Sequence, residues 1–325
     1  MDSITQVTLG AAIGDIVGGK DAGRKGMLWG GIAGLIPDLD VIFAPLYRQS
    51  EYFLFHRGIS HSMMFTTLLA PLMALLAYHI HRNTKISYKR WWLIAFLGLF
   101  THPLLDIMTV YGTGFYEPFS NARLALATIN IVDPLYTLPL LIPLVIRMAR
   151  KENPKWRKLL RNGFIVGQVY LSLTLLNSWY MYGVFKENLA AQNVQYDKIL
   201  AAPTLLNNVL WYGIAVNDTH AWFAYHSHLD NDTQVTFKRI PRNTHLTQKV
   251  DPFDMENLKR FSKGFYLLNE TDKGIVWTDL RFGLIDMNTF VFNYEFDKPE
   301  KRPFMASSDD DTYSRFLKRI LGSSN

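Results

Sequence analysis

Four short elements in the first half of the chain carry histidine and aspartate at spacings suited to metal chemistry. They are Pro37-Asp38-Leu39-Asp40, His56-Arg57-Gly58-Ile59-Ser60-His61-Ser62, His102-Pro103-Leu104-Leu105-Asp106 and Asp133-Pro134. A separation of four residues places His102 and Asp106 on one face of a helix. Imidazole and carboxylate groups bind divalent ions such as zinc, manganese and magnesium. The elements therefore predict a site for one or two such ions.

These elements lie in or beside long apolar stretches, where an ionised side chain costs several kcal/mol unless it is paired or bound. Arg57 is the one obvious basic residue among four carboxylates and three imidazoles. A bound cation would neutralise the excess negative charge. We expect the metal to be held by Asp38, Asp40, His56, His61, His102 and Asp106. Asp133 would be a further ligand or would support one of these residues.

Each element also has a purely structural explanation. The Pro-Asp-Leu-Asp element can end a helix and leave its acids in water. His102 and Asp106 can form a buried hydrogen-bonded pair, and Asp133 can cap the helix that Pro134 begins. We favour metal binding because one cation accounts for all four placements.

The elements belong to an apolar half of the chain. Residues 1–182 contain 10 of the 28 acidic residues, whereas residues 183–325 contain the other 18 and half of the Lys and Arg. Crossing the hydrocarbon core takes about 20 mostly apolar residues. Six segments are candidates, of which the first two are shorter or rich in glycine: Ile4–Gly19, Met27–Phe43, Ser62–Ile80, Trp91–Tyr111, Ile129–Ile146 and Gly163–Tyr182.

Basic residues in the intervening loops give the expected direction of these spans. Loops 20–26, 81–90 and 147–162 contain three, four and seven Lys or Arg, whereas loops 44–61 and 112–128 contain two and one. Short basic loops stay in the cytoplasm. The other loops and the C-terminal domain are then expected outside the cytoplasmic (inner) membrane. All candidate ligands fall at that outer end, although the orientation was derived without them.

The polar half has the pattern of a β-rich domain. Phe290, Phe292, Tyr294 and Phe296 alternate with polar or smaller residues. Further β-rich runs at 208–216, 221–227 and 274–282 are separated by Asn, Asp and Gly. The predicted fold is an α-helical polytopic membrane bundle of about six helices over residues 1–182, followed by a β-rich soluble domain over residues 183–325.

Composition excludes several other classes of function. The net charge of +6 resides in loops between apolar segments, so it predicts membrane orientation and no nucleic-acid partner. The absence of cysteine excludes disulfides and thiolate metal sites. The N-terminus lacks the pattern of a removable signal peptide. Gly10, Gly14 and Gly18 suit close helix packing, because no Lys-Ser/Thr pair follows them as in a phosphate-binding loop.

The ordered motifs resemble the YdjM family, whose members are described as membrane-bound metal-dependent hydrolases. The resemblance covers roughly residues 1–140 and is carried most specifically by His56-Arg57-Gly58-Ile59-Ser60-His61-Ser62. It implies an inner-membrane hydrolase. Members usually open with Thr-His, whereas this chain has Thr5-Gln6. The Gln6 amide can ligate a hard cation through oxygen but is a poor substitute for imidazole on zinc.

The expected activity is metal-assisted hydrolysis at the outer membrane surface. A metal there would lower the pKa of a water molecule, and one of the carboxylates Asp38, Asp40 or Asp106 would accept its proton. Arg57 would hold an anionic group of the substrate, although it can instead reach lipid headgroups. The site's depth favours a phosphoester of a membrane lipid or a prenyl-phosphate carrier. The alternatives are a metal-sensing or metal-transporting protein and a non-catalytic scaffold.

Overall fold

The chain forms two compact units, each assembled from separate parts of the sequence. A computed structural model describes residues 1–150, 153–272, 274–282, 292–296 and 310–322. Unit 1 comprises Met1–Phe43, Phe55–Leu126 and Ile131–Leu173. Unit 2 comprises Ala44–Leu54, Ala127–Asn130 and Thr174–Asn325. The predicted domain boundary after Tyr182 lies inside a long helix that contributes to both units.

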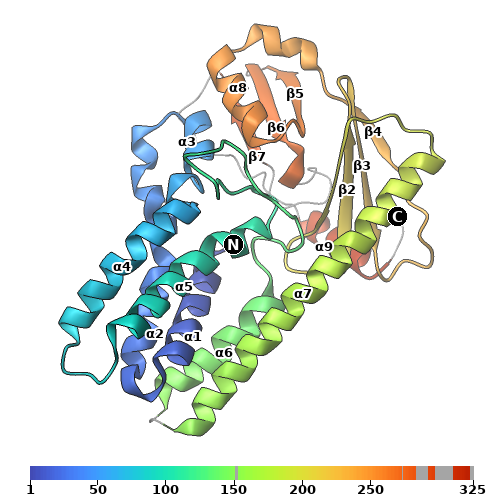
Figure 1. Cartoon of the computed structure of the whole chain (residues 1–325). Coiled ribbons are helices and arrows are strands. Elements are labelled where there is room, and N and C mark those ends of the chain that lie inside the picture. Colours follow the sequence, from blue (N-terminus) through green and yellow to red (C-terminus); the bar gives the residue numbers. More distant parts are fainter. Residues whose placement is uncertain (151–152, 273, 283–291, 297–309, 323–325) are drawn as a thin grey trace. The chain divides into compact units, whose positions relative to one another are not determined.

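Unit 1 is helical. Helix α1 contacts α2, α5 and α6, and α5 also contacts α2 and α4, an arrangement visible in Figure 1. The helical segments that lie wholly or mainly in this unit are α1 (Ser3–Ala22), α2 (Arg24–Leu35), the 3-10 helices η1 (Ile36–Leu46) and η2 (Ile59–His61), α4 (Met63–Ile80), α5 (Tyr88–Ile107), α6 (Pro134–Ala149) and the first half of α7 (Pro154–Ala191).

Glycines allow α1 and α2 to approach at backbone distance. A Cβ added at Gly10 would lie 2.2 Å from the carbonyl oxygen of Gly30, and one at Gly14 would lie 1.9 Å from that of Gly26. Real side chains cannot occupy such positions, so any larger residue would separate the helices. The glycines predicted to form a packing face do so at Gly10 and Gly14, and this contact fixes the end of α2 that precedes Asp38.

Among the residues that the structure describes, three helical segments are long and apolar enough to cross a membrane: Arg24–Leu46, Met63–Ile80 and Pro154–Ala191. The apolar helix Pro134–Ala149 is shorter. Helices occur at all six predicted places, but a count of six membrane spans is not confirmed. Helix α1 carries several polar residues, including Asp15, and α5 begins with Tyr88-Lys89-Arg90. These side chains reduce the apolar character on which a span depends.

Unit 2 contains two antiparallel sheets. The first has the order β1-β2-β3-β4 and the second the order β5-β6-β7. In the central hairpin every residue of β2 is buried, and Trp211 pairs with His226 and Gly213 with Ala224. The strands are β1 (Lys198–Pro203), β2 (Leu210–Val216), β3 (His220–Ser227), β4 (Lys238–Pro241), β5 (Tyr266–Thr271), β6 (Gly274–Asp279) and β7 (Phe292–Glu295).

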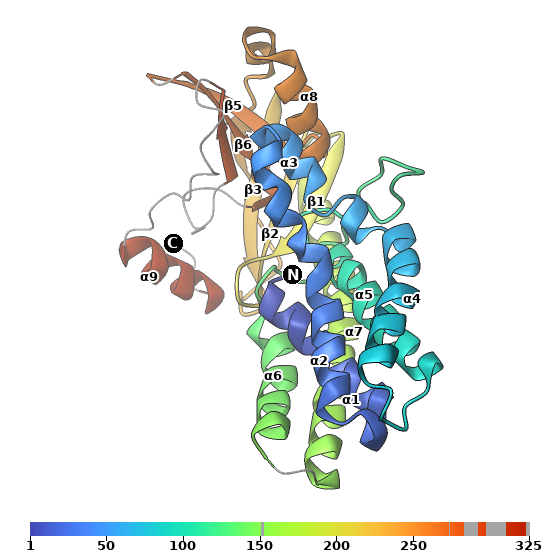
Figure 2. The same ribbon diagram turned by 90° about the vertical axis from the view of Figure 1, so that its left-hand side faces the viewer.

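Helices pack on both sheets of unit 2. The end of α7 packs on the first sheet through Phe185, Leu189 and Trp211, which are completely buried. Helix α8 (Pro252–Phe261) lies beside the second sheet, as Figures 1 and 2 show, and Phe261 is near the Trp277 ring of β6. Helix α3 (Gln49–Phe55) joins this layer, because the Phe53 ring stacks on Phe261 at 5.1 Å.

The expectation of a C-terminal sheet region is confirmed in its coarse form. Three predicted runs coincide with β2, β3 and β6, and the alternating aromatic run contains β7. Phe290, Val291 and Asp297 of that run lie outside the described residues. Helices α8 and α9 (Asp310–Ile320) and 3-10 helices η3 (Thr244–Lys249) and η4 (Leu280–Phe282) were not predicted. Asp251-Pro252 is a cap-and-first-turn signal for α8 that the sequence does contain.

Candidate metal centre

Three helical elements of unit 1 bring four of the predicted ligand residues together. Asp38 lies at the start of η1, His61 ends η2, and His102 and Asp106 lie one turn apart on α5. One ligand atom from each of these residues lies within 4.8 Å of all the others. We call these four residues the His/Asp cluster. This buried group could hold a metal ion.

Five of the six separations between the ligand atoms are close to those of a tetrahedral site, and the sixth, between Asp38 and Asp106, is at most 4.8 Å. The two Nε2 atoms of His61 and His102 are 3.1 Å apart. The Asp38 Oδ1 atom lies 3.6 and 3.3 Å from them, and Asp106 Oδ2 lies 3.3 and 3.7 Å from them. Zinc binds imidazole nitrogen at about 2.0–2.1 Å, so the ligands of a tetrahedral ion lie roughly 3.3 Å apart. The His/Asp cluster therefore has the dimensions of one small divalent ion.

Hydrogen bonds at the far side of each imidazole turn its Nε2 lone pair toward the centre. His102 Nδ1 lies 2.6 Å from the carbonyl oxygen of Gly34, which can only accept a proton. Ser60 donates its hydroxyl proton to Asp40 at 2.8 Å, so its oxygen accepts from His61 Nδ1 at 2.9 Å. Neutral imidazoles held in this way carry no proton on Nε2. Such outer contacts fix the tautomer of metal-binding histidines.

Two cationic groups offset part of the negative charge. Arg57 Nε lies 3.2 Å from Asp106 Oδ2, and the amino group of Met1 contacts Asp106 Oδ1. The carboxylates of Asp38, Asp40 and Asp106 exceed these two groups by one charge when the imidazoles are neutral. Asp106 Oδ2 is buried and accepts no hydrogen bond from the described residues. A divalent cation at the centre would bind that oxygen and more than offset the excess negative charge, so these residues fit a divalent metal.

Burial is unequal within the His/Asp cluster. His61, His102 and Asp106 are completely buried, whereas the Asp38 side chain is 12% exposed. The second oxygen of Asp38 accepts a hydrogen bond from Ser3 at 2.7 Å. Water therefore reaches the cluster from the side of Asp38.

Asp40 and His56 lie behind His61 and outside the group of four. Asp40 accepts hydrogen bonds from Ser60 and from the main-chain nitrogen of Arg57, and lies 2.8 Å from His56 Nδ1. Burial lowers the pKa of His56 below its ordinary value, although the contact with Asp40 opposes that shift. A neutral His56 donates its Nδ1 proton to Asp40. In this geometry the two residues support His61, and their predicted metal-binding role stays a prediction.

Gln6 lies where the YdjM pattern has histidine, directly beside the His/Asp cluster. Its amide nitrogen donates to Asp106 Oδ1 and to the carbonyl oxygen of His102, both at 3.1 Å. Its Oε1 atom is buried with no hydrogen-bond donor among the described residues. Exchanging the two amide atoms would place Oε1 against two acceptors, so the nitrogen faces Asp106. Gln6 contacts a ligand residue through a donor and offers the centre no lone pair.

Arg57 and Asp133 have structural partners. The Arg57 guanidinium lies between Asp106, Thr109 at 3.0 Å and the Tyr111 ring at 4.7 Å. Asp133 caps α6 through the main-chain nitrogens of Leu135 and Tyr136. It also accepts the Tyr170 hydroxyl at 2.7 Å. Asp133 is therefore not among the four grouped residues, and its metal-binding role stays a prediction.

Sequence reasoning did not assign the partners that orient the ligands. Ser60 lies next to His61 in the motif His56–Ser62, and this position could have indicated that its hydroxyl contacts the imidazole. The carbonyl oxygen of Gly34 and the hydroxyl of Ser3 had no signal in the sequence, because both contacts join residues that are far apart in the chain.

Comparison with known proteins places this geometry in a family. The family model described as YdjM inner membrane protein matches residues 1–184, which include the whole His/Asp cluster. The chain belongs to the YdjM family. The resemblance inferred from the motifs is thereby confirmed, and the apolar helices agree with an inner-membrane location.

A curated relative supports the same assignment for this YdjM-family chain. Inner membrane protein YbcI of Escherichia coli (strain K12) is 29% identical over 122 residues, which are 37% of this chain and 69% of that protein. No solved structure matches the chain. Membership of the YdjM family therefore rests on sequence, and the metal site rests on the geometry described above.

Proposed function

We propose that this YdjM-family protein is a membrane-bound hydrolase that uses a divalent metal to cleave a phosphoester of a lipid or lipid-like substrate at the outer membrane surface. The observation that carries the proposal is the convergence of His61, His102, Asp38 and Asp106 at tetrahedral spacing. The hydrolase and membrane expectations drawn from the sequence support it, and the substrate follows from where such a site would lie.

Four residues would hold the metal in this proposal. Two neutral imidazoles and two carboxylates suit zinc better than magnesium, which prefers oxygen ligands alone. A divalent ion held there would lower the pKa of a water molecule and polarise the scissile phosphoester. Asp106 is oriented by Arg57, and His61 by Ser60 and Asp40.

Asp38 would carry the proton-transfer step. It is the member of the His/Asp cluster that water reaches, and its Oδ2 atom lies on the side of Ser3. A carboxylate in that position can accept a proton from the attacking water. Asp40 would hold His61 in place through Ser60, and Arg57 would neutralise Asp106, so neither needs to touch the substrate.

The outer location follows from the distribution of basic residues between the apolar segments. A site at headgroup depth can meet a phospholipid or a prenyl-phosphate carrier without removing it from the bilayer. Membrane lipids are therefore the proposed partners and a lipid phosphoester the proposed substrate.

One observation favours a second candidate, a membrane protein that binds the metal as a sensor or carrier without catalysis. Catalytic zinc sites usually have three protein ligands and an open position, whereas four protein ligands are typical of closed sites. The His/Asp cluster supplies four ligands, three of which are completely buried. The hydrolase proposal thus requires that water enters beside Asp38.

Metal analysis of the purified protein tests the site itself. The wild-type protein should contain close to one equivalent of zinc, and His61→Ala and Asp106→Ala should contain almost none. His79→Ala is the matched control, because His79 is exposed and its ring hydrogen-bonds to the carbonyl oxygen of Leu75 in the same helix. Equal metal content in the wild-type and His61→Ala proteins would exclude the site.

Phosphate release from a panel of phosphorylated lipids tests catalysis. The wild-type protein should release phosphate, and a chelator or Asp38→Asn should abolish the release. A metal-loaded wild-type protein that releases no phosphate from any lipid would contradict the hydrolase proposal and favour the sensor or carrier.

A further inference from the structure

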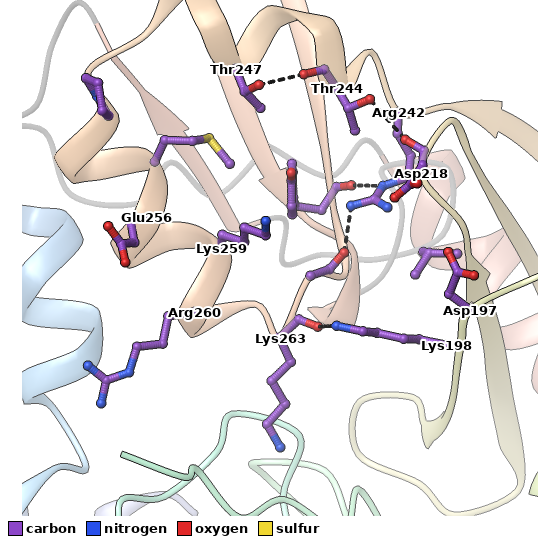
Figure 3. A pocket seen from close by; sticks show the side chains of 15 residues that line it. Asp197, Lys198, Asp218, Arg242, Thr244, Thr247, Glu256, Lys259, Arg260 and Lys263 are labelled. Atoms are coloured by element: carbon purple, nitrogen blue, oxygen red, sulfur yellow. Dashed lines mark hydrogen bonds between the residues drawn. The ribbon is translucent and has the colours of Figure 1, made fainter. Parts of the chain in front are cut away.

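A large cleft in unit 2 is lined by five cationic and three acidic residues. Its volume is about 1040 Å³, and its walls come from β1, the β2–β3 turn, the end of β4, η3, α8 and the start of β5. Figure 3 shows these side chains around the opening. We call it the basic cleft. Its five cationic residues are Lys198, Arg242, Lys259, Arg260 and Lys263, and its acidic residues are Asp197, Asp218 and Glu256.

Arg242 is the buried cation of the basic cleft, with an exposure of 6%. Its guanidinium donates to the carbonyl oxygens of Tyr266 at 2.8 Å, Asn217 at 2.5 Å and Gly264 at 2.7 Å. It also lies over the Tyr266 ring at 4.7 Å. No carboxylate of the described residues forms an ion pair with it. Burial lowers the pKa of Arg242, although the electrostatic effects of Tyr266, Asp218 and Asp197 oppose this shift.

Three of the five N–H donors of Arg242 are used by these carbonyl oxygens. Two remain for a ligand. The carbonyl contacts hold the planar guanidinium in one orientation, so a phosphate that offers two oxygen atoms would meet a rigid donor. An arginine that the fold immobilises without a carboxylate is suited to binding an anion.

Three lysines extend the positive charge along the cleft. Lys198 crosses from β1 and donates to the carbonyl oxygen of Lys263 at 2.8 Å. It passes close to Gly264, where an added Cβ would lie 3.0 Å from its ammonium nitrogen. Gly264 has a φ of +85°, a conformation that glycine adopts without strain. Lys259 lies in the last turn of α8, on the wall shown at the left of Figure 3.

The acidic residues do not balance this charge. Asp197 and Asp218 act electrostatically on Arg242 from a distance, and Glu256 lies on α8. All three are exposed and fully hydrated on one side. The lining therefore has an excess of two positive charges over a volume suited to a small molecule. Apolar groups of Val216, Met255 and Tyr266 provide the surface that the uncharged part of such a molecule would cover.

We propose that the basic cleft binds the phosphate monoester group of a small molecule or of a lipid headgroup, with Arg242, Lys259 and Lys263 as its principal contacts. The proposal goes beyond the hydrolase function, because it concerns unit 2 and needs no metal. It assigns a ligand to the half of the chain that lies almost entirely beyond the YdjM match.

Titration calorimetry on the purified full-length protein tests the proposal. One arm uses glycerol 3-phosphate, with glycerol as the uncharged control, and the other uses phosphatidic acid in mixed micelles. The wild-type protein should bind a phosphate monoester saturably and should ignore glycerol. The double variant K259Q/K263Q should bind about tenfold more weakly, because two cations near the anion are lost. K249Q is the matched control, since Lys249 is an exposed lysine outside the cleft.

Each outcome decides the proposal. Binding in the glycerol 3-phosphate arm that K259Q/K263Q weakens supports a soluble ligand, and the same pattern in the phosphatidic acid arm alone supports a lipid headgroup. No saturable binding in either arm, or equal weakening by K249Q and K259Q/K263Q, overturns it. The test uses K259Q/K263Q in place of Arg242→Gln because Lys259 is exposed and Lys263 is half-buried, whereas Arg242 is buried and donates to three main-chain carbonyl groups. The hydrolase proposal requires a metal and the cleft proposal does not. Phosphate binding that persists in the presence of a chelator therefore supports the cleft whether or not the protein is a hydrolase.

Discussion

The His/Asp cluster of unit 1 is small, buried and rich in carboxylates, whereas the basic cleft of unit 2 is large, open and rich in ammonium and guanidinium groups. Both leave charge that protein groups do not balance. In the cluster three carboxylates face two cationic groups and Asp106 Oδ2 accepts no hydrogen bond from the described residues, and in the cleft the Arg242 guanidinium forms no ion pair with them. The size of each space decides the class of ligand: a bare ion fits the cluster, and only a molecule fills the cleft.

The comparison also shows two ways of holding a charged side chain in place. The imidazoles of the cluster are oriented by one contact each, from Gly34 and from Ser60. Arg242 is held by three carbonyl oxygens. Hydrogen bonds to the atoms that face away from the ligand leave the binding atoms free, which is how a folded chain prepares a site before the ligand arrives.

The largest effect should come from Asp106→Ala, which removes a central ligand and the partner of Arg57. We expect complete loss of the metal and a loss of stability of about 3–5 kcal/mol, because a buried cation is left unpaired. Metal analysis and thermal unfolding in detergent measure both. Asp21→Asn is the control, since Asp21 pairs with Arg90 at the surface. Full metal content in Asp106→Ala would show that Asp106 does not bind the metal in the His/Asp cluster.

Ser60→Ala should have the next largest effect. It removes the hydroxyl that joins His61 to Asp40 but leaves all four ligand atoms in place. Removal of such a contact typically weakens metal binding about 10–100-fold. Competition with a chromogenic chelator measures the affinity, and Ser172→Ala is the control because Ser172 hydrogen-bonds only within its own helix. An unchanged affinity would show that the tautomer of His61 is fixed by another group.

Gln6→His tests how many metal ions the His/Asp cluster can bind. The imidazole would replace an amide that donates to Asp106 and would bring a new lone pair to the edge of the cluster. We expect either about tenfold tighter metal binding or a second equivalent of metal. Metal analysis with increasing zinc distinguishes the two. A protein with the same stoichiometry and affinity as wild type would mean that position 6 does not face the ion.

The smallest expected effect is that of salt, which should weaken ligand binding at the basic cleft but not at the His/Asp cluster. Raising ionic strength from 0.05 to 0.5 M, values chosen to span the Debye length from roughly 14 to 4 Å, should weaken phosphate binding to the basic cleft several-fold and leave the metal content unchanged. Exposed lysines are screened by ions, whereas a cluster that water hardly enters is not. Calorimetry and metal analysis on the same samples provide the comparison. Salt-insensitive phosphate binding would argue against the cleft as its location.

Much of the helical half could be predicted from the sequence. Each predicted apolar segment overlaps one of α1, α2, α4, α5, α6 and α7, because a long apolar run and its basic flanks are local properties. Predicted ends were less accurate. The segment from Ile129 was expected to be helical, but α6 begins at Pro134, where Asp133 caps it. The apolar run from Ile129 does not show where the helix starts. The start is set by the Asp133 side chain, which caps the first turn and was also a candidate metal ligand.

Unit 2 was harder to predict. Strands β2 and β3 have strong β-formers, whereas β1 has two alanines and a proline and gave no clear signal. The sequence contained no signal for the basic cleft, because its charged residues are spread over positions 197 to 263 and form no motif. Only the packing of α8 and two sheets gathers them.

The sequence by itself determined the residue types of the metal centre, the apolar character of its surroundings and the spacing of His102 and Asp106, because these are properties of neighbours along the chain. Tertiary structure decided which residues share the centre. Asp38 and His61 join the α5 pair, while Asp40, His56 and Gln6 contact them from behind or beside. Side chains only a few residues apart point in different directions on a turn, so distances below 4 Å depend on how three helical elements pack.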